Sequence, residues 1–311
     1  MTKKVLAIDG GGMYGVVSLE VCIAIEEKTG KQLRDLFDFF VGTSTGALIV
    51  ASAVAGLGGD RPFGLPATTI MEQYYDLGKN IFTAKNPNIE IPIVDIGKYP
   101  KYKAQALRIA LNEAIGERKI AKYDKDISIS AYDMKEGKPH FFRSWVDDVF
   151  LRDAVRASAS APTYHPLVEI DGSFYIDGGI FAGNPTYYAL GQALDLYPGE
   201  DLVVVSIGTG IRHHEFDTSN RDTVTWWAKN LADALLGGQN KATDEAMKQI
   251  AKKSDWLEYF RFDVDLPPEI NKKADELNED TLQEARNLMK AKLPQNRDQF
   301  DDFDDMVAKL R

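Results

Sequence analysis

The sequence predicts an α/β fold with three layers, α/β/α, in which helices cover both faces of a mainly parallel central sheet. Two consecutive strand–turn–helix units at the start of the chain are the main indication. In the first, an apolar run over residues 4–8 leads through a glycine cluster into helical spacing over 16–28. In the second, an aromatic and apolar run over 36–41 leads through the turn 42–46 into a small-residue helix over 47–55. Such units build parallel sheets whose functional turns lie at the carboxyl ends of the strands.

The later segments continue this pattern after a loop over 56–66 that is rich in glycine and proline. The expected helices are 68–77, 102–115 and 151–159, and the expected strands are 127–132, 140–145, 173–176 and 202–207. From residue 223 onward the chain is charged and mostly helical, with an extended stretch over 259–264. Because we find no repeat or low-complexity linker, we expect a single domain over 1–311, with its core motifs within 5–210 and a C-terminal helical part over 223–311.

Composition narrows the class of partner and compartment. The 311 residues are 44% hydrophobic and 27% charged, which is typical of a globular protein. The formal net charge of −10 disfavours nucleic acid as a partner, because an acidic surface repels phosphates. Cys22 is the only cysteine, so neither an intramolecular disulfide nor a cysteine-built zinc site is possible. The first residues lack a signal-peptide core and no apolar run approaches the ~20 residues of a membrane span, so we expect a cytoplasmic protein.

The turn Gly42-Thr43-Ser44-Thr45-Gly46 has the G-x-S-x-G form of a nucleophile elbow. In such an elbow a sharp strand-to-helix turn exposes the serine hydroxyl, and flanking side chains would collide, which explains the glycines. The alternative is a glycine-rich helix N-terminus that Ser44 or Thr43 merely caps.

The run Asp9-Gly10-Gly11-Gly12-Met13-Tyr14-Gly15 places nearly bare backbone N–H groups at the end of the first strand. Such a nest suits an anion, and together with the N–H of Thr45 it is a candidate oxyanion hole. The same glycines fit the dinucleotide-binding pattern G-x-G-x-x-G, although the second strand does not end in an acidic residue that would hold a ribose. D-G-G-G is also similar to the phosphate loop of actin-like sugar kinases, where a hairpin rather than a helix would follow.

Ser44 requires a base to remove its proton. His213 and His214 follow a strand and stand after Asp177 in chain order, so a Ser-His-Asp triad fits the sequence. Asp177 itself follows the apolar run 174–176 and begins a D-G-G turn. Burial would raise the pKa of its carboxyl and make it a better base, whereas the alternative is an ordinary Asp-Gly turn.

The order and spacing of these motifs resemble the patatin-like phospholipase family, which has a D-G-G-G loop, a G-x-S-x-G elbow roughly 30 residues later and a distant D-G-G or D-G-A. The segment Ala157-Ser158-Ala159-Ser160-Ala161-Pro162-Thr163-Tyr164-His165-Pro166 also resembles the family's A-S-x-S-A-P-x-Y-F-P block. The resemblance covers about residues 6–210.

The resemblance implies a patatin-like fold and a lipid acyl hydrolase of phospholipase A or lysophospholipase type. It implies Ser44 as nucleophile and Asp177 as base in a Ser-Asp dyad without histidine, with oxyanion donors from Gly10, Gly11 and Gly12. It further implies a phospholipid or galactolipid substrate, an acyl-enzyme intermediate, and no metal or cofactor.

Two residues depart from the family pattern. Tyr14 stands where the family usually has Arg or Lys, which puts a preference for anionic headgroups in doubt, and His165 replaces an aromatic residue and is expected to pack. A lipid hydrolase also needs transient contact with a membrane surface. Candidate segments are 86–100, which alternates isoleucines with polar residues, and 223–236, which carries Trp226 and Trp227. A half-buried strand explains the first pattern more simply, and packing of a helix on the protein body explains the second.

Overall fold

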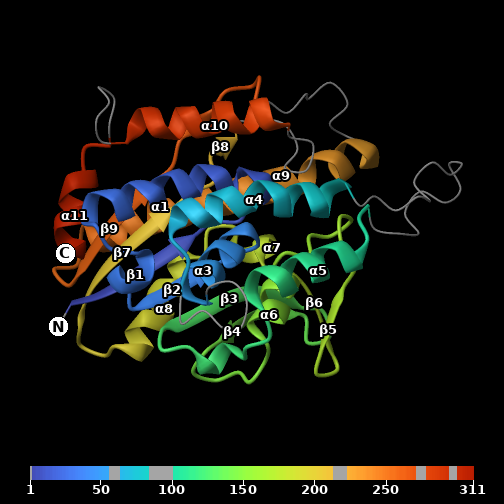
Figure 1. Cartoon of the computed structure of the whole chain (residues 1–311), viewed down its shortest axis with the longest axis horizontal. Helices are drawn as coiled ribbons and strands as arrows, with labels where there is room; N and C mark the ends of the chain where they lie inside the picture. Colours follow the sequence, from blue (N-terminus) through green and yellow to red (C-terminus); the bar gives the residue numbers. More distant parts are fainter. Residues whose placement is uncertain (1, 56–63, 84–100, 213–222, 271–277, 294–299) are drawn as a thin grey trace, which may run out of the picture.

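The structure is a computed structural model that describes residues 2–55, 64–83, 101–212, 223–270, 278–293 and 300–311 (Figure 1). Within these ranges an eight-stranded sheet has the order β5-β6-β3-β2-β1-β7-β9, with β4 also paired to β3. Its strands are β1 (Thr2–Ile8), β2 (Phe39–Gly42), β3 (Asp126–Asp133), β4 (Lys138–Arg143), β5 (Val168–Ile170), β6 (Ser173–Asp177), β7 (Asp201–Ile207) and β9 (Leu257–Phe262). β8 (Ile211–Arg212) and β10 (Asp265–Leu266) form a small separate pair.

Helices cover both faces of this sheet, which confirms the predicted three-layer α/β/α class (Figure 1). In β1, Leu6 and Ile8 belong to one buried apolar cluster, whereas Val5 and Ala7 belong to the other, because successive side chains of a strand point to opposite faces. The helices that contribute to the first cluster are α1 (Gly15–Thr29), α2 (Leu33–Leu36), α3 (Thr45–Ala55), α4 (Ala67–Thr83), α5 (Ala104–Ile115), α6 (Leu151–Ser158), α10 (Glu279–Lys292) and α11 (Phe303–Leu310). The second cluster is covered by α8 (Thr186–Leu196) and α9 (Val224–Ala251).

Four parallel strands end level with one another. Ile8 pairs with Gly42 on one side and with Ile207 on the other, and Ile207 pairs with Phe262. The turns that follow these residues therefore lie along one edge of the sheet, as expected for a parallel α/β architecture.

The strand β3 brings together the turns that follow β2 and β6, which are far apart in the sequence. Its residues 131–133 pair with both β4 and β6, and its residues 128–129 pair with both β4 and β2. Since a strand has only two edges, β2 and β6 share the edge opposite β4. β2 runs parallel to β3 and ends at Gly42 opposite Ile129, whereas β6 runs antiparallel and ends at Asp177 opposite Ala131. The carboxyl ends of β2 and β6 consequently face each other along this edge.

The observed elements differ from the predicted ones in a few places. β2 begins at Phe39 rather than at residue 36, because 33–36 form the short helix α2. Two elements were not predicted: β5, which has only three residues, and α8, in which Gly191 weakens the helical signal. Of the proposed lipid-contact segments, 86–100 lies outside the described residues. The segment 223–236 falls in α9, where the side chains are mostly not described. No helix among the described residues has the length and apolar character needed to cross a bilayer.

Candidate active site

The turn after β2 has the geometry of a nucleophile elbow. Ser44 has φ 53°, in the left-handed region, and α3 begins at the next residue. A Cβ atom on Gly46 would lie 2.1 Å from the carbonyl oxygen of Ile8, and one on Gly42 would lie 2.5 Å from the N atom of Ala47. Both motif glycines are therefore required by close backbone approach, and the strained serine is held by the packing around it.

The Ser44 side chain lies beside the carboxylate of Asp177, where its hydroxyl lowers the pKa of that carboxyl. Neighbouring groups fix both partners. The N–H of Ser44 donates to Ser158 Oγ at 2.8 Å, and the N–H of Asp177 donates to the Ser160 carbonyl at 3.0 Å. The N–H of Gly179 donates to Asp177 Oδ1 at 2.7 Å, which orients the carboxylate. Two residues separated by more than a hundred positions in the sequence thus lie side by side.

The environment of Asp177 makes its carboxylate a better proton acceptor. The residue is only 7% exposed, and burial raises the pKa of its carboxyl from 3.8 to about 6, against the opposing effects of the hydrogen bonds from Gly179 and Ser44. A carboxyl with a pKa near 6 is largely ionised at neutral pH but is a stronger base than an exposed aspartate.

The glycine loop after β1 lies against the elbow. A Cβ atom on Gly10 would lie 3.3 Å from the Ser44 Cβ. The N–H of Gly10 donates to the Gly183 carbonyl at 2.9 Å. For the N–H groups of Gly11, Gly12 and Thr45, the described part of the chain offers no backbone acceptor.

The aspartate that opens the glycine loop is held by an arginine from the C-terminal part of the chain. Asp9 is 1% exposed, and its two carboxylate oxygens accept hydrogen bonds from Arg261 at 2.9 and 2.6 Å. Burial raises the pKa of Asp9 to about 6 despite the adjacent guanidinium. Arg261 also donates to Asp263, which accepts the N–H of Gly210. This network ties the turns after β1, β7 and β9 together.

Among the described histidines, both have aromatic neighbours. His140 lies on β4, across β3 from Asp177, and its ring packs 4.5 Å from the Phe142 ring centroid. His165 is 8% exposed and lies with its ring centroid 5.7 Å from that of Tyr102, which agrees with the predicted packing role. His213 and His214, the proposed triad members, lie outside the described residues.

Three supporting residues were missed in the sequence. Ser158 lies within the recognised Ala-Ser block, but its hydroxyl had no assigned partner; Thr209 donates from its hydroxyl to the Gly10 carbonyl at 2.9 Å. Arg261 lies in the predicted extended stretch, where a cation alternating with aromatic residues was the available signal. Within the described ranges no group of three metal-ligating side chains is found.

Comparison with known proteins identifies the family to which this sequence is similar. The profile described as Patatin-like phospholipase matches residues 6–190. The chain is 27% identical over 302 residues to calcium-independent phospholipase A2-gamma of Rattus norvegicus, which covers 88% of this chain and 37% of that protein. It is also 27% identical to patatin-like protein 2 of Arabidopsis thaliana, over 72% of this chain and 63% of that protein. The chain therefore spans between about a third and two thirds of the length of these relatives.

A solved structure, VipD from Legionella pneumophila, is similar over 93% of this chain and 67% of that chain, with 13% identity and a TM-score of 0.40, a likeness too low to carry weight. The family match, by contrast, covers more than half of the chain and includes the glycine loop, the elbow and the D-G-G turn. The chain belongs to the patatin-like phospholipase family.

Proposed function

We propose that this protein is a lipid acyl hydrolase that cleaves an acyl ester of a phospholipid or galactolipid through an acyl-enzyme on Ser44. The observation that carries the proposal is the position of the Ser44 side chain on its elbow, beside the buried Asp177 carboxylate whose pKa it lowers. Membership of the family and the names of the related phospholipases support the class of substrate.

In the proposed acylation step, Asp177 takes the hydroxyl proton as Ser44 Oγ attacks the ester carbonyl carbon. The oxyanion that forms accepts hydrogen bonds from the N–H groups of Gly11, Gly12 and Thr45. The N-terminal end of α3, which begins at Thr45, adds the favourable end of its dipole. When the tetrahedral intermediate collapses, Asp177 returns its proton to the departing alcohol.

Deacylation repeats this sequence with water. Asp177 takes a proton from the attacking water, the oxyanion is again held by the same N–H groups, and the proton returns to Ser44 as the fatty acid leaves. One carboxylate thus serves both half-reactions, and each step balances in protons.

Transient contact with a lipid surface is part of the proposal, since the substrate resides in one. Ile180, three residues after Asp177, is 36% exposed and offers an apolar side chain near the site. We also propose a cytoplasmic location, because the single cysteine is buried and unpaired, as suits a reducing compartment.

The test is hydrolysis of a panel of phosphatidylcholine, phosphatidylglycerol and galactolipid in mixed micelles, with released fatty acid measured by mass spectrometry. We expect Ser44→Ala to abolish release and Asp177→Asn to lower kcat by roughly three orders of magnitude. Ser254→Ala, at the end of α9, is the matched control and should keep full activity. Equal loss in His213→Ala or His214→Ala would replace the dyad by a triad, and activity in Ser44→Ala would refute the proposal.

A further inference from the structure

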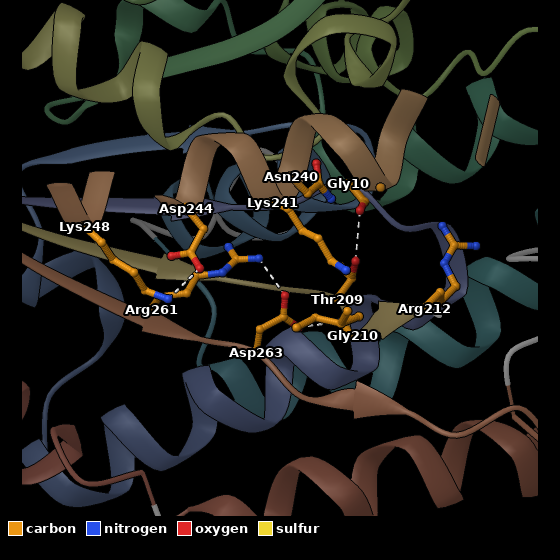
Figure 2. A pocket seen from close by; sticks show the side chains of 12 residues that line it. Gly10, Thr209, Gly210, Arg212, Asn240, Lys241, Asp244, Lys248, Arg261 and Asp263 are labelled. Atoms are coloured by element: carbon orange, nitrogen blue, oxygen red, sulfur yellow. Dashed lines mark hydrogen bonds and ion pairs between the residues drawn. The ribbon is translucent and has the colours of Figure 1, made fainter. Parts of the chain in front are cut away.

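A polar cavity borders the glycine loop at Gly10, and Ser44 is not among the residues that line it (Figure 2). Its volume is about 240 Å³. One wall is a single face of α9, on which the lining residues recur at intervals of three or four. The opposite wall is the loop after β7, and the ends of β1 and β9 complete it. The α9 residues are Gly237, Asn240, Lys241, Asp244 and Lys248.

Gly10 connects this cavity to the proposed active site. Its Cα position lies beside Ser44, as shown by the 3.3 Å separation of a built Cβ from the Ser44 Cβ. Its carbonyl accepts the hydroxyl of Thr209, which lines the cavity. The backbone of Gly10 therefore borders both the cavity and Ser44.

The charges around the cavity do not cancel. Lys248 is paired with Asp244 at 2.8 Å, and Arg261 is held by Asp9 and Asp263. The two remaining cations that line it, Arg212 and Lys241, have no carboxylate partner in the part of the chain that the structure describes. In a protein with a formal net charge of −10, two such cations lining one cavity indicate an anionic ligand.

The lining also selects the kind of anion. Ile211 is the one purely aliphatic side chain among the lining residues, so an acyl chain would gain little by entering. Arg212 offers a planar fork that matches phosphate oxygens, and its guanidinium is positioned 5.7 Å above the ring of Tyr14. Lys241 supplies a point charge from the opposite wall, where its side chain extends toward Thr209, and the Asn240 side chain lies close to Gly10 (Figure 2).

We infer that this cavity binds a phosphate ester, with Arg212 and Lys241 as its charged ligands. The inference deepens the proposed function, because a phosphate held there would lie next to the loop beside the nucleophile. The phosphate can belong to a phospholipid headgroup or to a free phosphate compound, and these sources require separate measurements.

The first measurement does not depend on catalysis. Calorimetry on the Ser44→Ala protein would record binding of sn-glycerol 3-phosphate and inorganic phosphate. We expect saturable binding that weakens as salt is raised, and a loss of affinity of roughly tenfold or more in the variant that combines Arg212→Gln with Lys241→Gln. Lys241→Gln alone keeps the contact of Arg212 with Tyr14 and should show part of the loss.

The second measurement identifies the source of the phosphate. With Ser44 intact, we compare kcat/KM for phosphatidylglycerol and for the uncharged diacylglycerol in neutral detergent micelles. If the site binds a lipid headgroup, the kcat/KM for phosphatidylglycerol divided by that for diacylglycerol should fall by roughly tenfold in the double variant. If the site binds a free phosphate compound, the double variant should lose binding while this ratio of kcat/KM values stays unchanged. The matched control combines Lys252→Gln with Lys253→Gln, which removes the same charge from exposed positions outside the cavity and should change neither measurement.

Failure of the two proposals can be told apart. If no lipid is hydrolysed but glycerol phosphate binds and the double variant loses it, the phosphate site stands and the hydrolase does not. If binding is absent and the substrate ratio is the same in all proteins, the phosphate site is refuted.

Discussion

Replacing Asp177 by asparagine should stabilise the protein while it removes activity. In the folded chain burial raises the pKa of this carboxyl from 3.8 to about 6. The ionised form is therefore disfavoured by folding, and asparagine keeps a carbonyl oxygen for the Gly179 N–H without the charge. A difference of about 2 pKa units corresponds to about 3 kcal/mol of unfolding free energy, which is an upper value for the gain.

The sign and the pH window follow from proton binding. Between pH 3.8 and about 6 the folded protein holds a proton on Asp177 that the unfolded chain has lost, so the stability of the wild type falls as the pH rises through this range. Asp177→Asn lacks this effect. The variant should match the wild type near pH 4 and exceed it by up to about 3 kcal/mol above pH 7.

Equilibrium denaturation in urea at pH 4, 6 and 8 measures this difference. Asp9 also has a pKa raised to about 6, but it is present in both proteins and cancels in the subtraction. Asp201→Asn, at an exposed position at the start of β7, controls for the removal of an ordinary carboxylate and should show no such trend. A variant that is no more stable than the wild type at pH 8, or a gain that is independent of pH, would refute the electrostatic argument.

Two further substitutions test the backbone and the network that surround the site. Gly46→Ala places a Cβ atom 2.1 Å from a β1 carbonyl oxygen. We therefore expect the unfolding free energy to fall by at least about 2 kcal/mol, and fatty acid release to be lost. Gly191→Ala, which meets no atom within 4 Å in α8, should instead be neutral or stabilising by up to about 1 kcal/mol. Arg261→Leu leaves the buried Asp9 carboxylate without its cation and should cost about 3 to 5 kcal/mol at pH 8. This cost should be smaller at pH 5, because the pKa of Asp9 rises further and the carboxyl protonates.

Two results would contradict these predictions. If Gly46→Ala is as stable and active as the wild type, the elbow does not need the close approach to β1. If the destabilisation by Arg261→Leu is the same at pH 5 and pH 8, the stability is lost because the arginine side chain no longer packs there, and not because the buried Asp9 carboxylate is left without its cation.

Local pattern was sufficient to predict the layers and the motif turns. The strand–turn–helix units, the elbow glycines and the D-G-G turn all depend on residues adjacent in sequence, and spacing reveals them. Spacing could not predict that the carboxyl ends of β2 and β6 face each other, because this depends on which edge of β3 each strand occupies. Resemblance to a family supplied the pairing of Ser44 with Asp177, whereas residue patterns alone left a histidine triad open.

The partners of two loop residues were inaccessible for the same reason. Gly10 looked equivalent to Gly11 and Gly12 in sequence, but the carbonyl that occupies its N–H belongs to Gly183, more than 170 positions away. The role of Arg261 was similarly hidden, since the buried aspartate it holds lies at the other end of the chain. Long-range partners of this kind have no local signal.

The central claim is that the Asp177 carboxylate activates the Ser44 hydroxyl directly. The rate of covalent labelling by a fluorophosphonate, followed from pH 4.5 to 8 with the modified residue identified by peptide mass spectrometry, tests it most directly. We predict labelling of Ser44 alone, with a rate that rises about tenfold per pH unit below the pKa of about 6 and levels off above it, and a flat, much slower rate in Asp177→Asn. Labelling of Asp177→Asn at the rate of the wild type, or modification of another residue, would contradict the account.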